Sequence, residues 1–104
     1  MVNVDFKNGN IDISIIIVSY NAKEYLRNCL YFIYSNRHIV NFETIVVDNS
    51  SIDKSPEMVK REFPQVRLIE NKENIGFARA NNIALRESQG RYILLLNNDT
   101  ILLP

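Results

Sequence analysis

The residues of this chain best suited to chemistry stand at the end of an apolar run near its C-terminus. The run Ile93-Leu94-Leu95-Leu96 stops abruptly at Asn97-Asn98-Asp99, whose side chains can offer oxygen atoms to a cation or a sugar. Four consecutive large apolar residues predict a strand buried on both faces of a parallel sheet. Open parallel sheets bind ligands beyond the carboxyl ends of their strands. The stretch therefore predicts a binding site, with an ordinary Asn/Asp turn as the alternative.

Two further polar segments end apolar runs earlier in the chain. Ser19-Tyr20-Asn21 follows a β-branched run that begins at Ile13, and Asp48-Asn49 follows the run from Phe42 to Val47. Because parallel strands end at one edge of a sheet, we expect these segments to gather with Asn97-Asn98-Asp99 on one rim. An aromatic ring there could stack on a base, and a carboxylate could accept a hydrogen bond from a base or ribose. A second carboxylate could hold a divalent cation.

The first helix that must position these segments is predicted directly after Tyr20. Asn21 is a good N-cap, and Glu24 three residues later completes a capping box. Apolar residues at helical spacing form one face of this helix: Leu26, Cys29, Leu30 and Ile33. We interpret Cys29 as a small core residue rather than a nucleophile. His38 has no Cys or His beside it and is interpreted as a solvated loop residue.

Two more helices and another strand complete the pattern. Ser55-Pro56 opens the second helix, with proline at the first helical position, and Phe63-Pro64 closes it. The segment 66–70 mixes apolar and polar residues, as an edge strand does. A third helix begins near Phe77, and Gly90 is its predicted C-terminal stop. The order β-α-β-α-β-α-β predicts a parallel sheet flanked by helices.

Composition is that of an ordinary globular domain. The 104 residues suffice for one domain, are 46% hydrophobic and include 12 basic and 12 acidic residues, so nothing indicates a nucleic-acid partner. A single cysteine excludes an internal disulfide, and no apolar run approaches the roughly 20 residues of a transmembrane segment. We predict a flexible N-terminal tail at residues 1–10, with a short extra strand there as the alternative, and one domain at 11–104. The predicted location is the cytoplasm, with peripheral membrane association left open.

Glycine-rich phosphate loops of the Rossmann and P-loop types are absent from the sequence. Four ordered segments instead resemble the family 2 glycosyltransferases, most closely the rhamnosyltransferase-like branch: 18–21, 46–53, 74–82 and 95–100. The resemblance covers about residues 13 to 101. It implies the GT-A fold, a three-layer α/β/α Rossmann-like arrangement with a mostly parallel four-stranded sheet in the order 3-2-1-4. It also implies a nucleotide-sugar donor, a Mg²⁺ or Mn²⁺ ion and inversion at the anomeric carbon.

The resemblance implies roles for individual residues. Tyr20 would lie along the nucleoside and Asp48 would bind the base. Asp53 would lie near that pocket or serve only as a helix-entry charge, and Arg79 would line the donor site or be a solvated helix charge. Asp99 would be the main metal ligand, since Asn97 stands at the first acidic position of the family's Asp-x-Asp motif. The residues predicted to bind the donor nucleotide are Ser19, Tyr20, Asn21, Asp48, Asp53, Asn74, Gly76, Arg79, Asn82, Asn97 and Asn98.

Family members continue past the metal motif into an acceptor-binding half that carries the general base. The resemblance therefore implies that this chain is the donor-binding half of a glycosyltransferase, with no general base and no sugar transfer by itself. The alternative is a non-catalytic remnant that binds a nucleotide or a protein.

Without the second half, residues 92–96 would form an unpaired apolar edge of the sheet. Such an edge predicts a homodimer, formed through this edge or through the tail 101–103.

Overall fold

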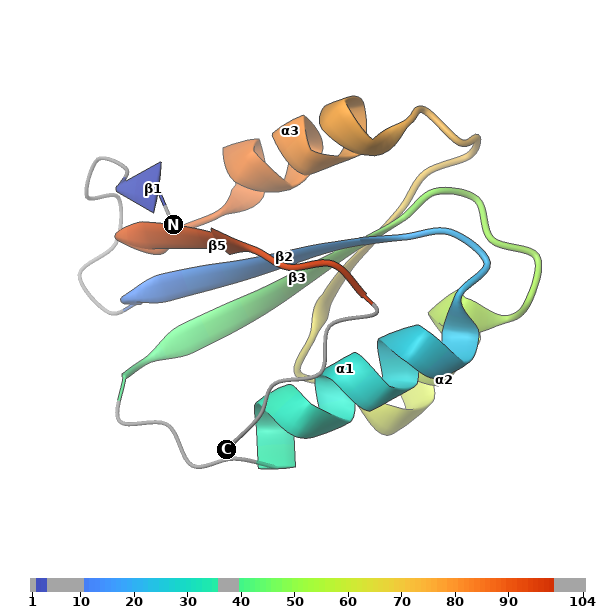
Figure 1. Ribbon diagram of the computed structural model, residues 1–104, viewed down its shortest axis with the longest axis horizontal. Helices are drawn as coiled ribbons and strands as arrows, with labels where there is room; N and C mark the ends of the chain where they lie inside the picture. The colour runs from blue at the N-terminus through green and yellow to red at the C-terminus, as the bar shows by residue number, and fades with distance from the viewer. Residues whose placement is uncertain (1, 4–10, 36–39, 99–104) are drawn as a thin grey trace.

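The computed structural model describes residues 2–3, 11–35 and 40–98, which form a sheet between two layers of helices (Figure 1). The five-stranded sheet has the order β1-β5-β2-β3-β4. Its strands are β1 (Val2–Asn3), β2 (Ile13–Ser19), β3 (Phe42–Asp48), β4 (Arg67–Glu70) and β5 (Tyr92–Leu95). The helices are α1 (Lys23–Ser35), α2 (Ser55–Glu62) and α3 (Phe77–Glu87). The four strands β2 to β5 pair in parallel in the order β4-β3-β2-β5, which confirms the predicted order 3-2-1-4.

Both faces of the central strands are apolar, so residues next to each other in sequence belong to two different cores. On one face, Ile15, Ile17 and Val46 pack against α1 and α2, where the predicted face of α1 is buried. On the other face, Ile16 and Ile45 pack against Ala80 and Ala84 of α3. Period-two alternation sends successive strand residues to opposite faces. Two covered faces are what near-continuous apolar strands require.

The strand registers align the carboxyl ends of the central strands. Ser19 at the end of β2 pairs with Asp48 at the end of β3, and Asp48 pairs with Glu70 at the end of β4. The segments that follow β2 and β3 therefore start side by side, as predicted for this part of the rim. None of the helices in the described part of the chain is long and apolar enough to cross a membrane.

Three local predictions about the helices are wrong. Asn21 lies two residues before α1 with φ 47, so it is not the N-cap, and Glu24 pairs with Arg27 instead of completing a capping box. Pro56 is the second residue of α2, not the first. Gly90 does not stop α3, because the helix ends at Glu87 and Ser88 caps it, donating its hydroxyl to the carbonyl of Leu85 at 2.7 Å.

The edge at β5 also differs from the prediction. β1 pairs antiparallel with β5, joining Val2 to Ile93 and Asn3 to Tyr92, so the edge is covered along that half. Only Ile93 of β5 is fully buried, and Leu95 is 47% exposed, so the strand is not buried on both faces throughout. The tail predicted at residues 1–10 thus contains a strand, while residues 1, 4–10, 36–39 and 99–104 lie outside the described residues.

Candidate functional site

The rim at the carboxyl ends of the strands is organised by the turn that follows β3. Asp48 is only 2% exposed, and its two carboxylate oxygens accept hydrogen bonds from the backbone N–H of Ser51 at 2.9 Å and from its hydroxyl at 2.6 Å. The carbonyl of Asp48 accepts from the N–H of Asn71 at 2.9 Å. Asp48 therefore fixes this turn, and its predicted contact with a base stays a prediction.

Asn49 ties the turn to the loop between β4 and α3. Its side chain is 3% exposed, and its amide nitrogen donates to the carbonyl of Gly76 at 3.2 Å. Its amide oxygen accepts from the side-chain amide of Asn71 at 2.9 Å and from the N–H of Ile75 at 3.5 Å. The sequence prediction missed this role, although the position directly after a buried strand end was a signal for it.

The segment after β2 is held by the same turn. The N–H of Asn21 donates to the Ser51 hydroxyl at 2.8 Å, and its side-chain oxygen accepts from the N–H of Ile52 at 2.8 Å. These contacts fix Asn21 in the left-handed region, which asparagine tolerates better than most residues. Tyr20 beside it is 50% exposed, so one of its surfaces is open to a ligand.

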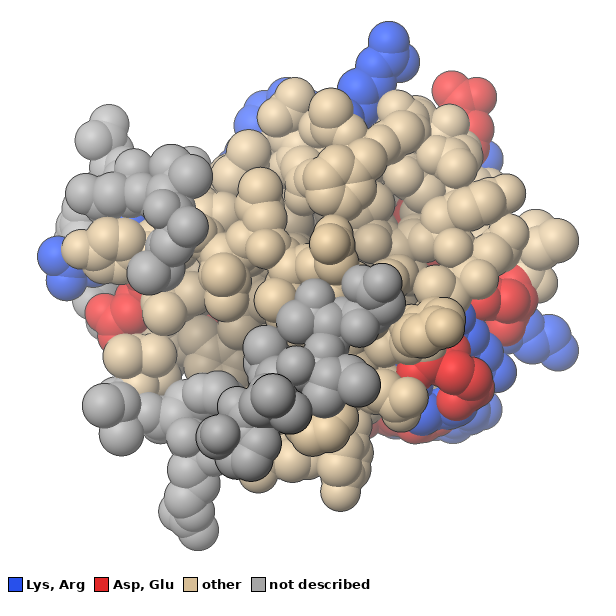
Figure 2. Space-filling view, in the orientation of Figure 1, with Lys and Arg blue, Asp and Glu red and all other residues tan. Residues whose placement is uncertain are grey.

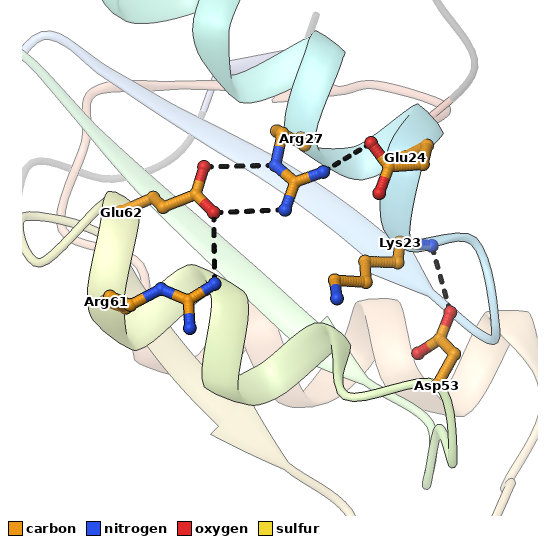
Figure 3. A network of polar contacts seen from close by, with 6 residues as sticks. All are labelled: Lys23, Glu24, Arg27, Asp53, Arg61 and Glu62. Carbon is orange, nitrogen blue, oxygen red and sulfur yellow. Dashed lines mark hydrogen bonds and ion pairs between the residues drawn. The ribbon is translucent and has the colours of Figure 1, made fainter.

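Asp53 holds the starts of two helices rather than the rim itself. One carboxylate oxygen accepts from the N–H of Lys23, the first residue of α1, at 3.0 Å (Figure 3). The other accepts from the N–H of Ser55, the first residue of α2, at 3.0 Å and from the Ser55 hydroxyl. Partial burial alone would raise the pKa of Asp53, but the hydrogen bonds from Ser55 and Lys23 outweigh it and lower the pKa below its ordinary value.

Replacing Asp53 with alanine is expected to destabilise the fold by about 1 to 2 kcal/mol near neutral pH, the scale of lost helix caps. A lowered folded-state pKa means that the carboxylate stabilises the fold above the ordinary carboxyl pKa of about 4 and loses this effect as pH falls below it. Urea unfolding across this pH range should therefore show the difference between wild type and Asp53→Ala shrinking in acid. A constant difference would contradict the capping role.

Beside Asp53, a cluster of charged side chains fastens α1 to α2 (Figure 3). The guanidinium of Arg27 donates to both carboxylate oxygens of Glu62 at 3.0 Å and also contacts Glu24. These hydrogen bonds raise the pKa of Arg27 and lower that of Glu62. The cluster is exposed and links two helices, so it is a structural feature rather than part of the site.

The segment after β5 reaches the rim through Asn98. The amide nitrogen of Asn98 donates to the hydroxyl of Ser19 at 3.3 Å, which leaves its amide oxygen for a ligand, and Asn97 is exposed. The predicted metal ligand Asp99 lies outside the described residues. Within residues 2–3, 11–35 and 40–98, no three acids, histidines or cysteines are grouped to hold a metal. The amide oxygens of Asn97 and Asn98 are hard donors of the type that Mg²⁺ and Mn²⁺ accept.

The loop that enters α3 has an open helix start. The Asn74 side-chain oxygen accepts from the N–H of Gly76 at 2.9 Å, and Gly76 has φ 86 and precedes a helix with no side-chain cap. Arg79 and Asn82 are exposed and line a surface hollow of about 270 Å³ on α3. Open backbone N–H groups and a free guanidinium favour anionic ligands.

Most of the predicted site residues fall into three places. Six of them are linked by hydrogen bonds at the rim, directly or through the turn after β3: Ser19, Asn21, Asp48, Asn74, Gly76 and Asn98. Asp53 lies between α1 and α2, and Arg79 and Asn82 lie on α3, on the other face of the sheet (Figure 1). An exposed aromatic ring, amides and an open helix start next to one another suit a ligand with a planar base, hydroxyls and phosphates.

Comparison with known proteins adds an independent observation. Residues 14–104 match the family model of glycosyl transferase family 2. The chain is 37% identical over 91 residues to a teichoic acid poly(glycerol phosphate) polymerase from Staphylococcus epidermidis, covering 84% of this chain and 12% of that protein. It matches a mannosyltransferase from Pyrobaculum calidifontis in complex with GDP-Man and Mn²⁺ at 27% identity and a TM-score of 0.75, covering 93% of this chain and 30% of that one.

TarS from S. aureus has the same fold over this region, with a TM-score of 0.78 at 24% identity, covering 86% of this chain and 28% of TarS. The chain spans between 12% and 36% of the length of the curated relatives it matches. These proteins therefore extend well beyond the region that this chain shares with them.

Proposed function

The chain belongs to glycosyl transferase family 2, and we propose that it binds the nucleotide-diphosphate sugar of an inverting sugar transfer. The observation that supports this proposal is that the segments resembling the family lie together at one rim of the sheet. There, hydrogen bonds from Asp48, Asn49 and Asn98 connect the loops that follow the strands. Residues 11–104 would be the donor-binding part of a longer catalytic unit. The general base and the acceptor site would then come from residues outside this chain.

In this proposal the exposed ring of Tyr20 lies along the nucleoside, and Asp48 contacts the base from the end of β3. Asn21, Asn74, Gly76, Arg79 and Asn82 line the donor site, and Arg79 meets the phosphates from the first turn of α3. Asn97, Asn98 and Asp99 would hold Mg²⁺ or Mn²⁺, and such an ion would supply charge neutralisation of the diphosphate and Lewis acidity towards the leaving group. The likeness to the rhamnosyltransferase-like branch stays a prediction, and so does the cytoplasmic location.

We expect a nucleoside diphosphate to bind weakly and more tightly with Mn²⁺ than without it. Asp99→Ala should abolish the effect of Mn²⁺ on affinity, because it removes the main charged ligand. Asp48→Ala should weaken binding even without metal. Calorimetric titration of both variants and wild type, with and without Mn²⁺, measures these effects.

Asp12→Ala is the matched control, since Asp12 is an acid at the opposite end of β2, where its carboxylate accepts from the N–H of Asn41 at 3.1 Å. Its affinity should equal that of wild type. Because Asp48 also fixes the turn at Ser51, each variant's unfolding midpoint must be measured as well. Equal nucleotide affinity in all four folded proteins would contradict the site assignment.

A homodimer through β5 stays a prediction, but less of the strand's edge is uncovered than the sequence predicted. β1 covers the strand at Tyr92 and Ile93, so among the described residues the uncovered edge begins at Leu94 and includes the half-exposed Leu95. A short uncovered edge pairs less readily than a long one.

The alternative function is that of a non-catalytic remnant that only binds nucleotide. It would use the same rim, and it would differ from the proposed transferase in having no catalytic acceptor-binding half.

A further inference from the structure

The outer face of α3 carries a surface hollow of about 270 Å³. The resemblance implies a role for only two of its lining residues, Arg79 and Asn82. The hollow is lined by Ile75, Arg79, Asn82, Ile83 and Arg86. Arg79, Asn82, Ile83 and Arg86 follow the i, i+3, i+4, i+7 spacing of one helix face. The two arginines are seven residues apart, a rise of about 10 Å along the helix. Figure 2 shows basic side chains over α3 at the top of the view, with uncharged surface between them.

Both guanidinium groups of the hollow lack an acidic partner in the part of the chain that the structure describes. Elsewhere in that part, Arg27, Arg61 and Arg67 each form an ion pair. The only acid on α3, Glu87, is already paired with Arg67 at 2.6 Å. Among the described residues, Arg79 and Arg86 therefore form no ion pair, and no acid lines the hollow that they share.

We propose that this hollow binds a second kind of ligand, with two phosphate groups joined by a carbon linker, which shares Arg79 and Asn82 with the proposed donor site and adds Arg86. A guanidinium group suits phosphate because its N–H groups donate in a planar fork. The spacing of Arg79 and Arg86 separates two phosphates, while Ile75 and Ile83 offer apolar contact to the linker between them. The amide of Asn82 can bond to a hydroxyl on that linker.

The hollow extends beyond the proposed donor site. Arg79 is in the first turn of α3, next to the rim, whereas Arg86 is in the last turn, where α3 has run away from the rim (Figure 1). Arg86 lies about 10 Å farther along α3 than Arg79, in the direction away from the rim. The inference goes beyond the proposed function, because Arg86 has no part in the predicted donor site.

Fructose 1,6-bisphosphate and fructose 6-phosphate are suitable probes, because they differ chiefly in the second phosphate. In NMR titrations of the 104-residue chain, we expect the bisphosphate to shift the amide signals of α3 and to bind roughly 3- to 10-fold more tightly than the monophosphate. Arg86→Ala should reduce this preference to less than about 2-fold, and Arg86→Lys should keep part of it. Arg61→Ala is the matched control, because Arg61 is an exposed helical arginine on α2, across the sheet.

A nucleoside diphosphate with Mn²⁺ separates the two ligands. We expect its affinity to be the same in wild type and Arg86→Ala. If Arg86→Ala weakens nucleotide and bisphosphate equally, the hollow is the phosphate end of the donor site and the proposal is wrong. It is also wrong if wild type shows no bisphosphate preference, or if Arg61→Ala loses it as Arg86→Ala does. Failure of wild type to bind any nucleotide would contradict the proposed function alone, because the bisphosphate titration does not depend on it.

Discussion

Gly90→Ala is expected to destabilise the fold by about 3 kcal/mol, near the upper end of the range for added atoms in a packed interior. A Cβ atom at this position would lie 2.5 Å from the backbone nitrogen of Ser14 and 2.8 Å from the carbonyl carbon of Ile13. Both atoms belong to the backbone of β2 in the middle of the sheet, so they cannot rotate away. The N–H of Gly90 also donates to the Ser14 hydroxyl at 2.8 Å in a buried site.

Denaturant unfolding of Gly90→Ala measures this loss, and a second substitution separates its causes. Ser14→Ala removes the hydroxyl that the new Cβ would also meet at 2.6 Å, but it leaves the backbone atoms in place. The double variant should therefore recover little of the stability that Gly90→Ala loses. Full recovery in the double variant would show that the close contact is with the side chain and that the sheet backbone tolerates a Cβ.

Gly90 illustrates which parts of the fold the sequence predicts and which it does not. The strands from Ile13 and Phe42, and the buried face of α1, follow from local apolar patterns, and the structure confirms them. Gly90 was predicted to stop α3, because glycine after a helical pattern is commonly a C-cap. Its actual role is a close approach to Ser14, a residue 76 positions away. No local pattern contains such a contact.

The same distinction applies to the site. The rim could be predicted because parallel strands end together. The partners within it could not, because Asp53 caps a helix that starts 30 positions earlier and Asn49 holds a loop 22 to 27 positions later. Asn21 was predicted as the N-cap of α1 from its neighbours alone. In the structure, its side chain is used by the turn after β3, and Asp53 supplies the hydrogen bond to the first N–H of α1.

Asn49→Ala is expected to destabilise the fold by about 2 to 3 kcal/mol, since a buried amide loses its hydrogen bonds and its former partners are left without them. The loop between β4 and α3 carries Asn74, Gly76 and the open start of α3, so its position depends on this amide. We therefore also expect nucleoside diphosphate affinity to fall by about 10-fold, the equivalent of about 1.4 kcal/mol. Asn71→Ala removes only one of the side-chain bonds to Asn49, and it should cost about 1 kcal/mol.

Asn49→Asp tests the same contact with almost no change of shape. Its carboxylate would still accept from Asn71 and Ile75, but it would place an oxygen against the Gly76 carbonyl where the amide now donates. Burial and this repulsion should raise the pKa of the introduced carboxyl group in the folded state. A raised pKa means that protonation favours the folded state, so the variant should gain stability relative to Asn49→Ala as pH falls. Unfolding midpoints that stay parallel from neutral pH to acid would show that the Asn49 amide does not hold the loop.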